Sequence, residues 1–441
     1  MTFAYDQATT GENLRRLLKD SRRWVNRRVD SLRLDADGTT RRYVSLDLTV
    51  PKDLVCGGAY QQMLVPLGVL EKGTKQRFDA SHDGKAIPVL GRKDNSAIVA
   101  QMLKASQPSI LSSAPGEDAT GDDLFIKIAA CDPVDSESIW TEYVTWSEGI
   151  LSGCDLSPKQ QDDLEAFDSL VDQMTRNFVL LVEVDDQLAG RRVVMKYALD
   201  QDEPMTNDPG TSRLVIAQAV PDLGFAASHH VELEVPAGLS VRDLKLVELR
   251  GAGDNQKDRF ASKASTGRVA HVSIDPSTPD AIGILRAEVA VAKQGVFSFT
   301  IVTVWALLAA SLTASFIRLF DDFFIRGEPE IPSPAASILL VGPALLISWM
   351  SRTPEHPMLA RMLRPLRHML TIAAFSLVVM AGLAAVKVQP WIWEYAWGLL
   401  LVLALVNVTW LIIFCMNVQL PTKRKFEFGV AYENEEDLEG H

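Results

Sequence analysis

Cysteine is scarce in this chain, and the common catalytic signatures are missing. The 441 residues include four cysteines, Cys56, Cys131, Cys154 and Cys415, whose spacing does not match a paired metal site. The chain has no Gly-x-x-x-x-Gly-Lys-Ser/Thr phosphate loop, no His-Glu-x-x-His motif and no Gly-x-Ser-x-Gly nucleophile turn. Gly251-Ala252-Gly253 lacks the third glycine of a dinucleotide site. We therefore expect free thiols packed as small apolar groups, no cofactor, and no enzyme of a common class.

Charge is absent from four long stretches toward the C-terminal end, residues 296–317, 331–351, 369–386 and 395–422. Each is close to the roughly 17 to 25 residues that a helix needs to cross the hydrocarbon layer of a membrane. Only helices or closed barrels satisfy their backbone polar groups there. The lack of ionisable groups disfavours a secondary transporter, which generally needs them inside the membrane. We predict a four-helix transmembrane bundle over residues 296–420.

Basic residues predict the orientation of these spans, because Lys and Arg are retained on the cytoplasmic side. Nine basic residues near the spans fall on one side and three on the other. The richer side includes Arg286, Lys293, Arg352, Arg361, Arg364, Arg367, Lys423, Arg424 and Lys425. Residues 1–15 lack the apolar core of a secretory signal. We expect a bacterial inner (plasma) membrane protein with both termini in the cytoplasm and an acidic cytoplasmic tail over residues 421–441.

A basic segment lies within the first 38 residues. Its apolar residues recur at helical spacing between positions 14 and 32, with arginines between them, which predicts a basic amphipathic helix. The basic face could contact the anionic inner leaflet, dock on an acidic segment of the chain, or simply be solvated. Nucleic acid is disfavoured as a partner by the net charge of −12. The residues that we expect at a membrane-surface or partner contact are Arg22, Arg23, Arg27, Arg28 and Trp24.

The region over residues 39–294 has the period of β-structure. Residues 43–50 alternate between apolar and polar, as in a half-buried strand. We predict hairpins that join 76–80 to 86–90, around Asp83-Gly84, and 178–184 to 192–199. Further strands are expected at 213–220, 230–235, 269–274 and 284–292. The predicted fold class is α+β, with an antiparallel sandwich-like cytoplasmic head.

An acidic segment interrupts these strands. Residues 117–172 contain fifteen acids and two bases, Lys127 and Lys159, a net charge of −13. Apolar residues at helical spacing, such as Tyr143 with Trp146 and Leu164 with Phe167, predict helices with solvated acidic faces. We expect a helical insertion over about residues 117–175 within the β head.

Three groups of residues are candidate sites. His230, Glu232 and Glu234 would share one face of a strand and are the metal candidates, although a polar outer face over an apolar core is the more usual explanation of such a strand. His82 lies in a predicted turn, where a solvated histidine is usual. Ser311, Thr313, Asn407 and Thr409 could line a pore in an oligomer, or hydrogen-bond neighbouring helices.

Three segments carry a resemblance to a known group. They are Arg22 to Val25, the strand Arg41 to Pro51, and the phrase His229 to Leu239. They resemble segments of actinobacterial multi-pass membrane proteins with a β-rich cytoplasmic N-terminal region. The resemblance implies a bacterial plasma membrane and carries no activity or functional residue.

These observations predict an integral membrane protein whose cytoplasmic head binds a ligand or protein in a sensor, scaffold or regulatory role. The expected partners are the lipid bilayer, an anionic lipid or cytoplasmic protein, and further copies of the chain. A head-gated oligomeric channel or membrane effector is the first alternative, which ion flux in vesicles would distinguish. An enzyme with an unrecognised site in the head is the second, which a bound metal or nucleotide would reveal.

Overall fold

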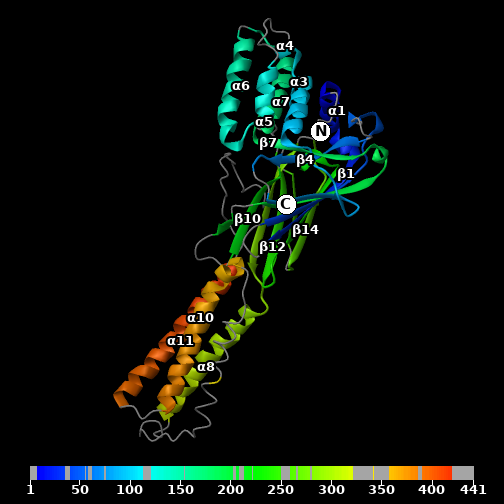
Figure 1. Cartoon of the computed structure of the whole chain (residues 1–441). Helices are drawn as coiled ribbons and strands as arrows, with labels where there is room; N and C mark the ends of the chain where they lie inside the picture. The colour runs from blue at the N-terminus through cyan, green and yellow to red at the C-terminus, as the bar shows by residue number, and fades with distance from the viewer. Residues whose placement is uncertain are drawn as a thin grey trace. The chain divides into compact units, whose positions relative to one another are not determined.

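The computed structural model describes residues 7–34, 40–54, 56–57, 62–73, 76–112, 121–152, 154–201, 205–207, 213–220, 222–249, 259–264, 267–278, 281–320, 341, 357–385 and 390–419. It separates into two compact units. The first comprises Met1–Thr206 with Val215–Val289, and the second comprises Asn207–Leu214 with Ala290–His441. The first unit is β-sheet-rich with added helices, and the second contains the apolar helices (Figure 1).

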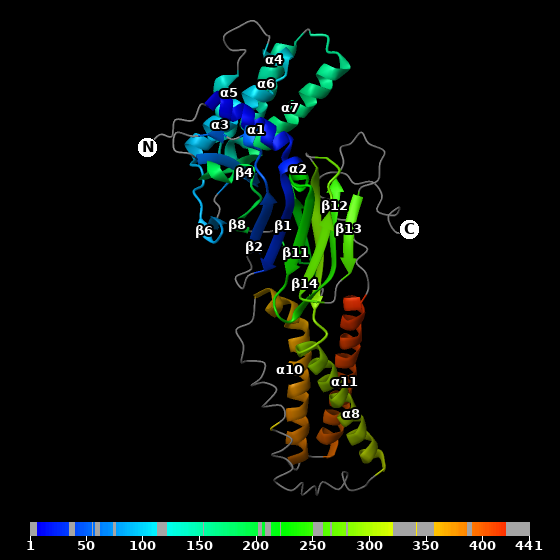
Figure 2. The ribbon, with the colours of Figure 1, turned by 90° about the vertical axis from the view of Figure 1, so that its right-hand side faces the viewer.

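A seven-stranded sheet holds strands from distant parts of the chain, in the order β14-β11-β1-β2-β8-β5-β6. Its members are β1 (Val25–Leu34), β2 (Thr40–Leu48), β5 (Gln76–His82), β6 (Lys85–Ala86), β8 (Val193–Gln201), β11 (Ser228–Glu234) and β14 (Val269–Ile274). β1 pairs antiparallel with β2 and parallel with β11. The neighbours β2, β1, β11 and β14 are visible side by side in Figure 2. Residues 25–34 are thus central to the sheet.

The predicted turn at Asp83-Gly84 is confirmed, because β5 pairs antiparallel with β6 across these two residues, but the second strand is shorter than the predicted 86–90, since Val89 pairs with Val182 of another sheet. Both turn residues have positive φ, 50° at Asp83 and 75° at Gly84, as a tight two-residue hairpin turn requires. The second predicted hairpin is wrong. β7 (Asn177–Asp185) pairs with β4 (Gln62–Glu71), whereas β8 pairs with β2 and β5, so the two strands belong to different sheets.

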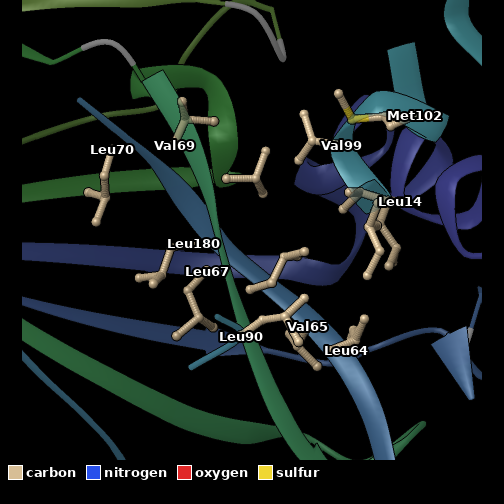
Figure 3. Packing of buried hydrophobic residues seen from close by; sticks show 14 of the residues in the cluster. Leu14, Leu64, Val65, Leu67, Val69, Leu70, Leu90, Val99, Met102 and Leu180 are labelled. Atoms are coloured by element: carbon tan, nitrogen blue, oxygen red, sulfur yellow. The ribbon is translucent and has the colours of Figure 1, made fainter. Parts of the chain in front are cut away.

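A three-stranded sheet, in the order β3-β4-β7, forms the centre of the core; β3 spans Cys56–Gly57. β4 is buried over eight consecutive residues, so it reads as an apolar run rather than an alternating strand. In Figure 3, Leu64 and Val65 of β4 lie toward Leu14 of a helix, whereas Leu180 of β7 lies beside Leu67 of β4, and all of them belong to one buried apolar cluster. Met195 and Leu199 of β8 belong to the same apolar cluster.

Helices complete this unit. α1 (Gln7–Lys19) packs on α3 (Arg92–Ser106), which also contacts α5 (Asp122–Ala130). α6 (Ser136–Leu151) and α7 (Pro158–Arg176) lie beside α5, and α4 (Ser109–Ser112) contacts α6 (Figure 1). α7 begins with a capping box, in which the Ser157 hydroxyl accepts from the backbone of Gln160 and the Gln160 side chain accepts from the backbone of Ser157. The described residues of the acidic segment are therefore mostly helical, as the apolar spacing predicts.

A five-stranded sheet contains the remaining strands in the order β13-β12-β15-β10-β9. They are β9 (Met205–Asn207), β10 (Arg213–Val220), β12 (Leu239–Leu249), β13 (Arg259–Ala264) and β15 (Ile282–Val291). β12 alternates over much of its length, with Leu239, Val241, Leu244 and Leu246 buried. The N-terminal region is therefore β-sheet-rich within a mixed α/β architecture.

The expected basic helix over residues 14–32 is wrong in its second half. The chain is helical in α1 and in the single turn α2 (Ser21–Trp24), and it then continues as β1. Arg28, Asp30 and Leu32 alternate inward on this strand. In a short segment, the spacing of the apolar residues can fit both the helical period of 3.6 and the strand period of 2. Pairing with β2 and β11 makes residues 25–34 a strand.

The described residues of the second unit include three helices that are long and apolar enough to cross a membrane, α8 (Val296–Phe320), α10 (Pro357–Ala385) and α11 (Pro390–Gln419). They pack on one another (Figure 2). Three of the four predicted spans coincide with them, although α10 begins before the charge-free run and includes Arg361, Arg364 and Arg367. The predicted span over 331–351 and the tail over 421–441 lie outside the described residues, apart from Val341, which is helical.

Candidate functional site

Five ionisable residues meet inside the seven-stranded sheet, and we call them the buried charge cluster: Arg28, Asp30, Arg42, Asp222 and His229. Arg28 and Asp30 point inward from β1, Arg42 comes from β2, and His229 lies beside Arg28 in the parallel register of β11. Asp222 precedes the short 3-10 turn Leu223–Phe225. None is more than 6% exposed. Charged residues are almost never buried to this extent unless they are paired.

Arg28 is the centre of the cluster. Its Nε donates to Asp30 Oδ1 over 2.8 Å, its Nη1 donates to Asp222, and its Nη2 donates to the hydroxyl of Tyr197 over 3.1 Å. Arg42 donates to the second oxygen of Asp30 through Nε over 3.2 Å and also through Nη2. Two guanidinium groups therefore balance two carboxylates, which is the arrangement that makes buried charge tolerable.

Burial and charge act in opposite directions on Asp30. Burial alone would raise its pKa, but the nearby Arg28 and Arg42 outweigh that effect and hold the pKa well below its ordinary value. Burial raises the pKa of Tyr197 to about 12, partly offset by Arg28. The carboxylate therefore stays ionised and the phenol stays protonated at neutral pH.

His229 lies between two acceptors. Its Nδ1 is 3.3 Å from the carbonyl oxygen of Leu223, and its Nε2 is 3.6 Å from Asp30 Oδ2, too far for a hydrogen bond. Within the described part of the chain, Nδ1 is therefore the ring nitrogen of His229 that has a hydrogen-bond partner, and Nε2 has none.

A glycine of β4 makes room for the Arg28–Asp222 pair. Gly68 has φ of +149° at an irregularity in the β4–β7 pairing. A Cβ at this position would lie 3.1 Å from Asp222 Oδ2 and 3.2 Å from Arg28 Nη1. The cluster therefore packs directly against the backbone of the central sheet.

The metal candidates lie on the opposite, outer face of β11. Glu234 pairs with Arg33 at 3.1 Å and with Arg268 at 3.3 Å, so it is already engaged. His230 instead meets His271 of β14, with 3.1 Å between Nδ1 and Nε2. Glu232 lies opposite His271 in the register. Among the described residues, no three His, Cys, Asp or Glu side chains converge on one point as they stand.

The expected surface contact is revised by the structure. Arg28 and Trp24 are buried, so neither can touch a membrane surface or partner as we expected. Trp24 donates from Nε1 to the carbonyl of Leu17 over 2.9 Å. Arg22 is half-buried and donates to the carbonyl of Ser277, whereas Arg23 and Arg27 are exposed.

Two further predictions concern isolated residues. His82 is the last residue of β5 rather than a solvated turn residue, because its side chain is partly buried and its Nδ1 lies 3.0 Å from the carbonyl oxygen of Val194 in β8. Cys131 and Cys415 are partly buried free thiols, whereas Cys154 is an exposed one, so the expected apolar packing is wrong for Cys154. Cys131 also accepts from the amine of the buried Lys72 over 3.0 Å, and burial lowers the pKa of that amine.

The polar residues of the apolar helices mostly bond within their own helix. Thr313 donates to the carbonyl of Ala309, and Thr409 donates to that of Leu405. Asn407 is the exception. It is 1% exposed, and its Nδ2 donates over 3.0 Å to the carbonyl of Met369 in α10. Ser311 is also buried, with its hydroxyl 4.0 Å from the Met380 sulfur.

Sequence reasoning missed the members of the buried charge cluster other than Arg28, and it missed His271. Asp30 and Arg42 stand at inward positions of strands, which a correct assignment of β1 would have shown. Asp222 and His229 carry no local signal, because their partners are distant in the chain. No family model matches this chain, and no curated protein matches it closely enough to count as a relative.

Proposed function

We propose that this protein is an integral membrane protein whose β-rich head binds a ligand or protein in a sensor, scaffold or regulatory role. The observation that carries the proposal is the outer surface of the three apolar helices. Large apolar side chains are exposed there, including Val302 at 66%, Phe375 at 65% and Leu399 at 61%. Such a surface is stable in lipid and would be a liability in water.

The head supplies a surface suited to recognition. Tyr43 of β2 is 41% exposed on the outer face of the sheet. The guanidinium carbons of Arg33 and Arg41 lie 5.1 and 5.6 Å from the centre of its ring. Tyrosine and arginine are enriched at protein interfaces, where an amphipathic ring and a planar cation bind with little loss of entropy. His230 and Glu232 lie on the same face.

The finer features of the proposal follow from the distribution of charge and from packing. Residues 331–351 would complete a four-helix bundle in a bacterial inner membrane, with the head and both termini in the cytoplasm. The five- and seven-stranded sheets would form a sandwich, an arrangement supported by the proximity of β12 to β14. Arg23 and Arg27 are the residues left for contact with an anionic leaflet.

The membrane part is tested with the whole chain. Alkaline extraction of cell membranes should leave the protein in the pellet, and vesicles that contain the purified protein should show no ion flux above empty vesicles. Release by alkali would refute membrane integration. Ion flux would instead favour the head-gated channel. In that case the buried Oδ1 of Asn407, which has no hydrogen-bond partner among the described residues, would be a candidate pore-lining atom.

The head is tested by a photo-crosslinking residue at Tyr43, with the same residue at exposed Thr145 of α6 as the control. We expect a discrete adduct in cells from position 43 that Arg33→Glu removes, and none from position 145. Equal labelling from both positions would contradict a binding surface on the outer face.

A further inference from the structure

We infer that the outer face of β11 and β14 holds a site for a divalent transition-metal ion such as Zn²⁺, with His230 Nδ1 and His271 Nε2 as ligands and Glu232 as the third. This inference rests on the proposed binding role of the head and names a class of ligand for it. It also changes the composition of the predicted site, since His271 of the neighbouring strand replaces Glu234, which is held by Arg33 and Arg268.

The spacing of the two ring nitrogens suits a single metal ion. They lie 3.1 Å apart, and the ring centres are 5.2 Å apart. Two imidazole nitrogens bound to tetrahedral Zn²⁺ at about 2.0 to 2.1 Å lie about 3.3 Å from each other. The side chains therefore need to separate by only a few tenths of an ångström. In the metal-free protein, one ring donates to the other across the same gap.

The second nitrogen of His230 is already oriented. Its Nε2 lies 3.1 Å from the hydroxyl of Ser228, on the same face of β11. When Nε2–H donates to this oxygen, the lone pair of Nδ1 points toward His271. Metal-binding histidines generally have their other nitrogen held by such an outer partner, which sets the tautomer. Ser228 is thus a positioning residue for the ligand.

A carboxylate beside the pair supplies the third ligand. Glu232 lies directly opposite His271 in the strand register, so its carboxylate can reach the gap by side-chain rotation. Neutral imidazole is the form that binds metal, and the carboxylate balances part of the charge of a divalent ion. Water would complete the coordination.

This donor set also predicts selectivity. Two nitrogen ligands with one carboxylate suit Zn²⁺, Co²⁺ or Ni²⁺, whereas Mg²⁺ and Ca²⁺ prefer oxygen ligands throughout. We expect Mg²⁺ and Ca²⁺ not to compete at this site.

The experiment uses the full-length protein in detergent, purified without a polyhistidine tag. Co²⁺ is titrated while its visible absorption is recorded, and Zn²⁺ is then added to displace it. Loss of outer partners alone weakens metal sites by about 10- to 100-fold, so His230→Gln or His271→Gln should weaken binding at least tenfold, and Ser228→Ala by about tenfold. His82→Gln, at the end of β5 and separated from β11 by three strands of the sheet, is the matched control and should bind as the wild type does.

Thermal unfolding provides a second measurement if a variant folds poorly. Zn²⁺ should raise the Tm of the wild type and of His82→Gln, because an ion that binds only the native state stabilises it. It should not raise the Tm of His271→Gln. The metal site would be overturned if the wild-type protein shows no Co²⁺ absorption. It would also be overturned if the double variant His230→Gln/His271→Gln binds Co²⁺ as the wild type does. Either result would leave the extraction, flux and crosslinking tests of the proposed function unaffected.

Discussion

Replacing Asp30 by Asn tests whether the buried charge cluster stabilises the head. Asparagine keeps the shape of the side chain but removes the negative charge that Arg28 and Arg42 share. The Asp30 side chain is 3% exposed, and the two arginines are 0% and 5% exposed. The variant would leave two buried guanidinium groups with Asp222 as the remaining carboxylate of the cluster.

The expected cost is large because water cannot compensate for the lost charge. Removing one partner of a buried ion pair typically destabilises a protein by about 3 to 5 kcal/mol. For a unit of this size, each kcal/mol lowers the Tm by about 2 to 4 °C. Together these values predict a fall of roughly 6 to 20 °C in the unfolding temperature of the head.

Asp122→Asn is the matched control. Asp122 is 47% exposed and pairs with Lys104 over 2.7 Å, so water screens the interaction and little change in Tm is expected. Unfolding of the full-length protein in detergent would be followed by tryptophan fluorescence, since Trp24 is buried against Phe225 in the head. If Asp30→Asn lowers the Tm no more than Asp122→Asn does, the cluster is not the stabilising element that its burial implies.

A double-mutant cycle refines the test. Asp30→Asn combined with Arg42→Met should destabilise the head by clearly less than the sum of the two single changes, because the first change already removes the carboxylate to which Arg42 donates. Additive effects would mean that the two side chains do not interact.

Three further predictions follow from the same contacts. Gly68→Ala should cost about 1 to 3 kcal/mol in unfolding free energy, since φ of +149° strains an L-residue; Gly149→Ala, whose Cβ would meet nothing within 4 Å, is the control and should not destabilise. Acid should lower the Tm of the head, because Asp30 has a lowered folded-state pKa. Its contribution to the unfolding free energy is present above the unfolded pKa of about 4 and is lost as pH falls through the folded value. The Tm of Asp30→Asn should therefore depend less steeply on pH in that range. Asn407→Leu should lower the unfolding free energy of the apolar helices by about 1 kcal/mol or less, because one interhelical hydrogen bond in a membrane is worth about 0.6 kcal/mol on average. A loss of stability as large as that of Asp30→Asn would contradict a purely local role for this hydrogen bond.

Hydrophobic periodicity predicted much of the local structure, and its failures have a common cause. The alternation over residues 43–50 matches β2, and the acidic helices follow their apolar spacing. β4 was missed because burial on both faces removes the alternation that marks a strand. The hairpin expected between β7 and β8 failed because each strand found its partners in another sheet.

The sequence by itself determined the apolar helices of the second unit, because a charge-free run of this length satisfies its backbone polar groups internally as a helix. It also determined the Asp83-Gly84 turn, which depends on two adjacent residues. Only the tertiary structure decided that Arg28 is a buried residue of a strand. Its partner Asp222 is 194 residues away, and no local pattern reports a charge that is balanced across that separation. His230 and His271 likewise meet because β11 and β14 are neighbours, a pairing set by the packing of the whole sheet rather than by either segment alone.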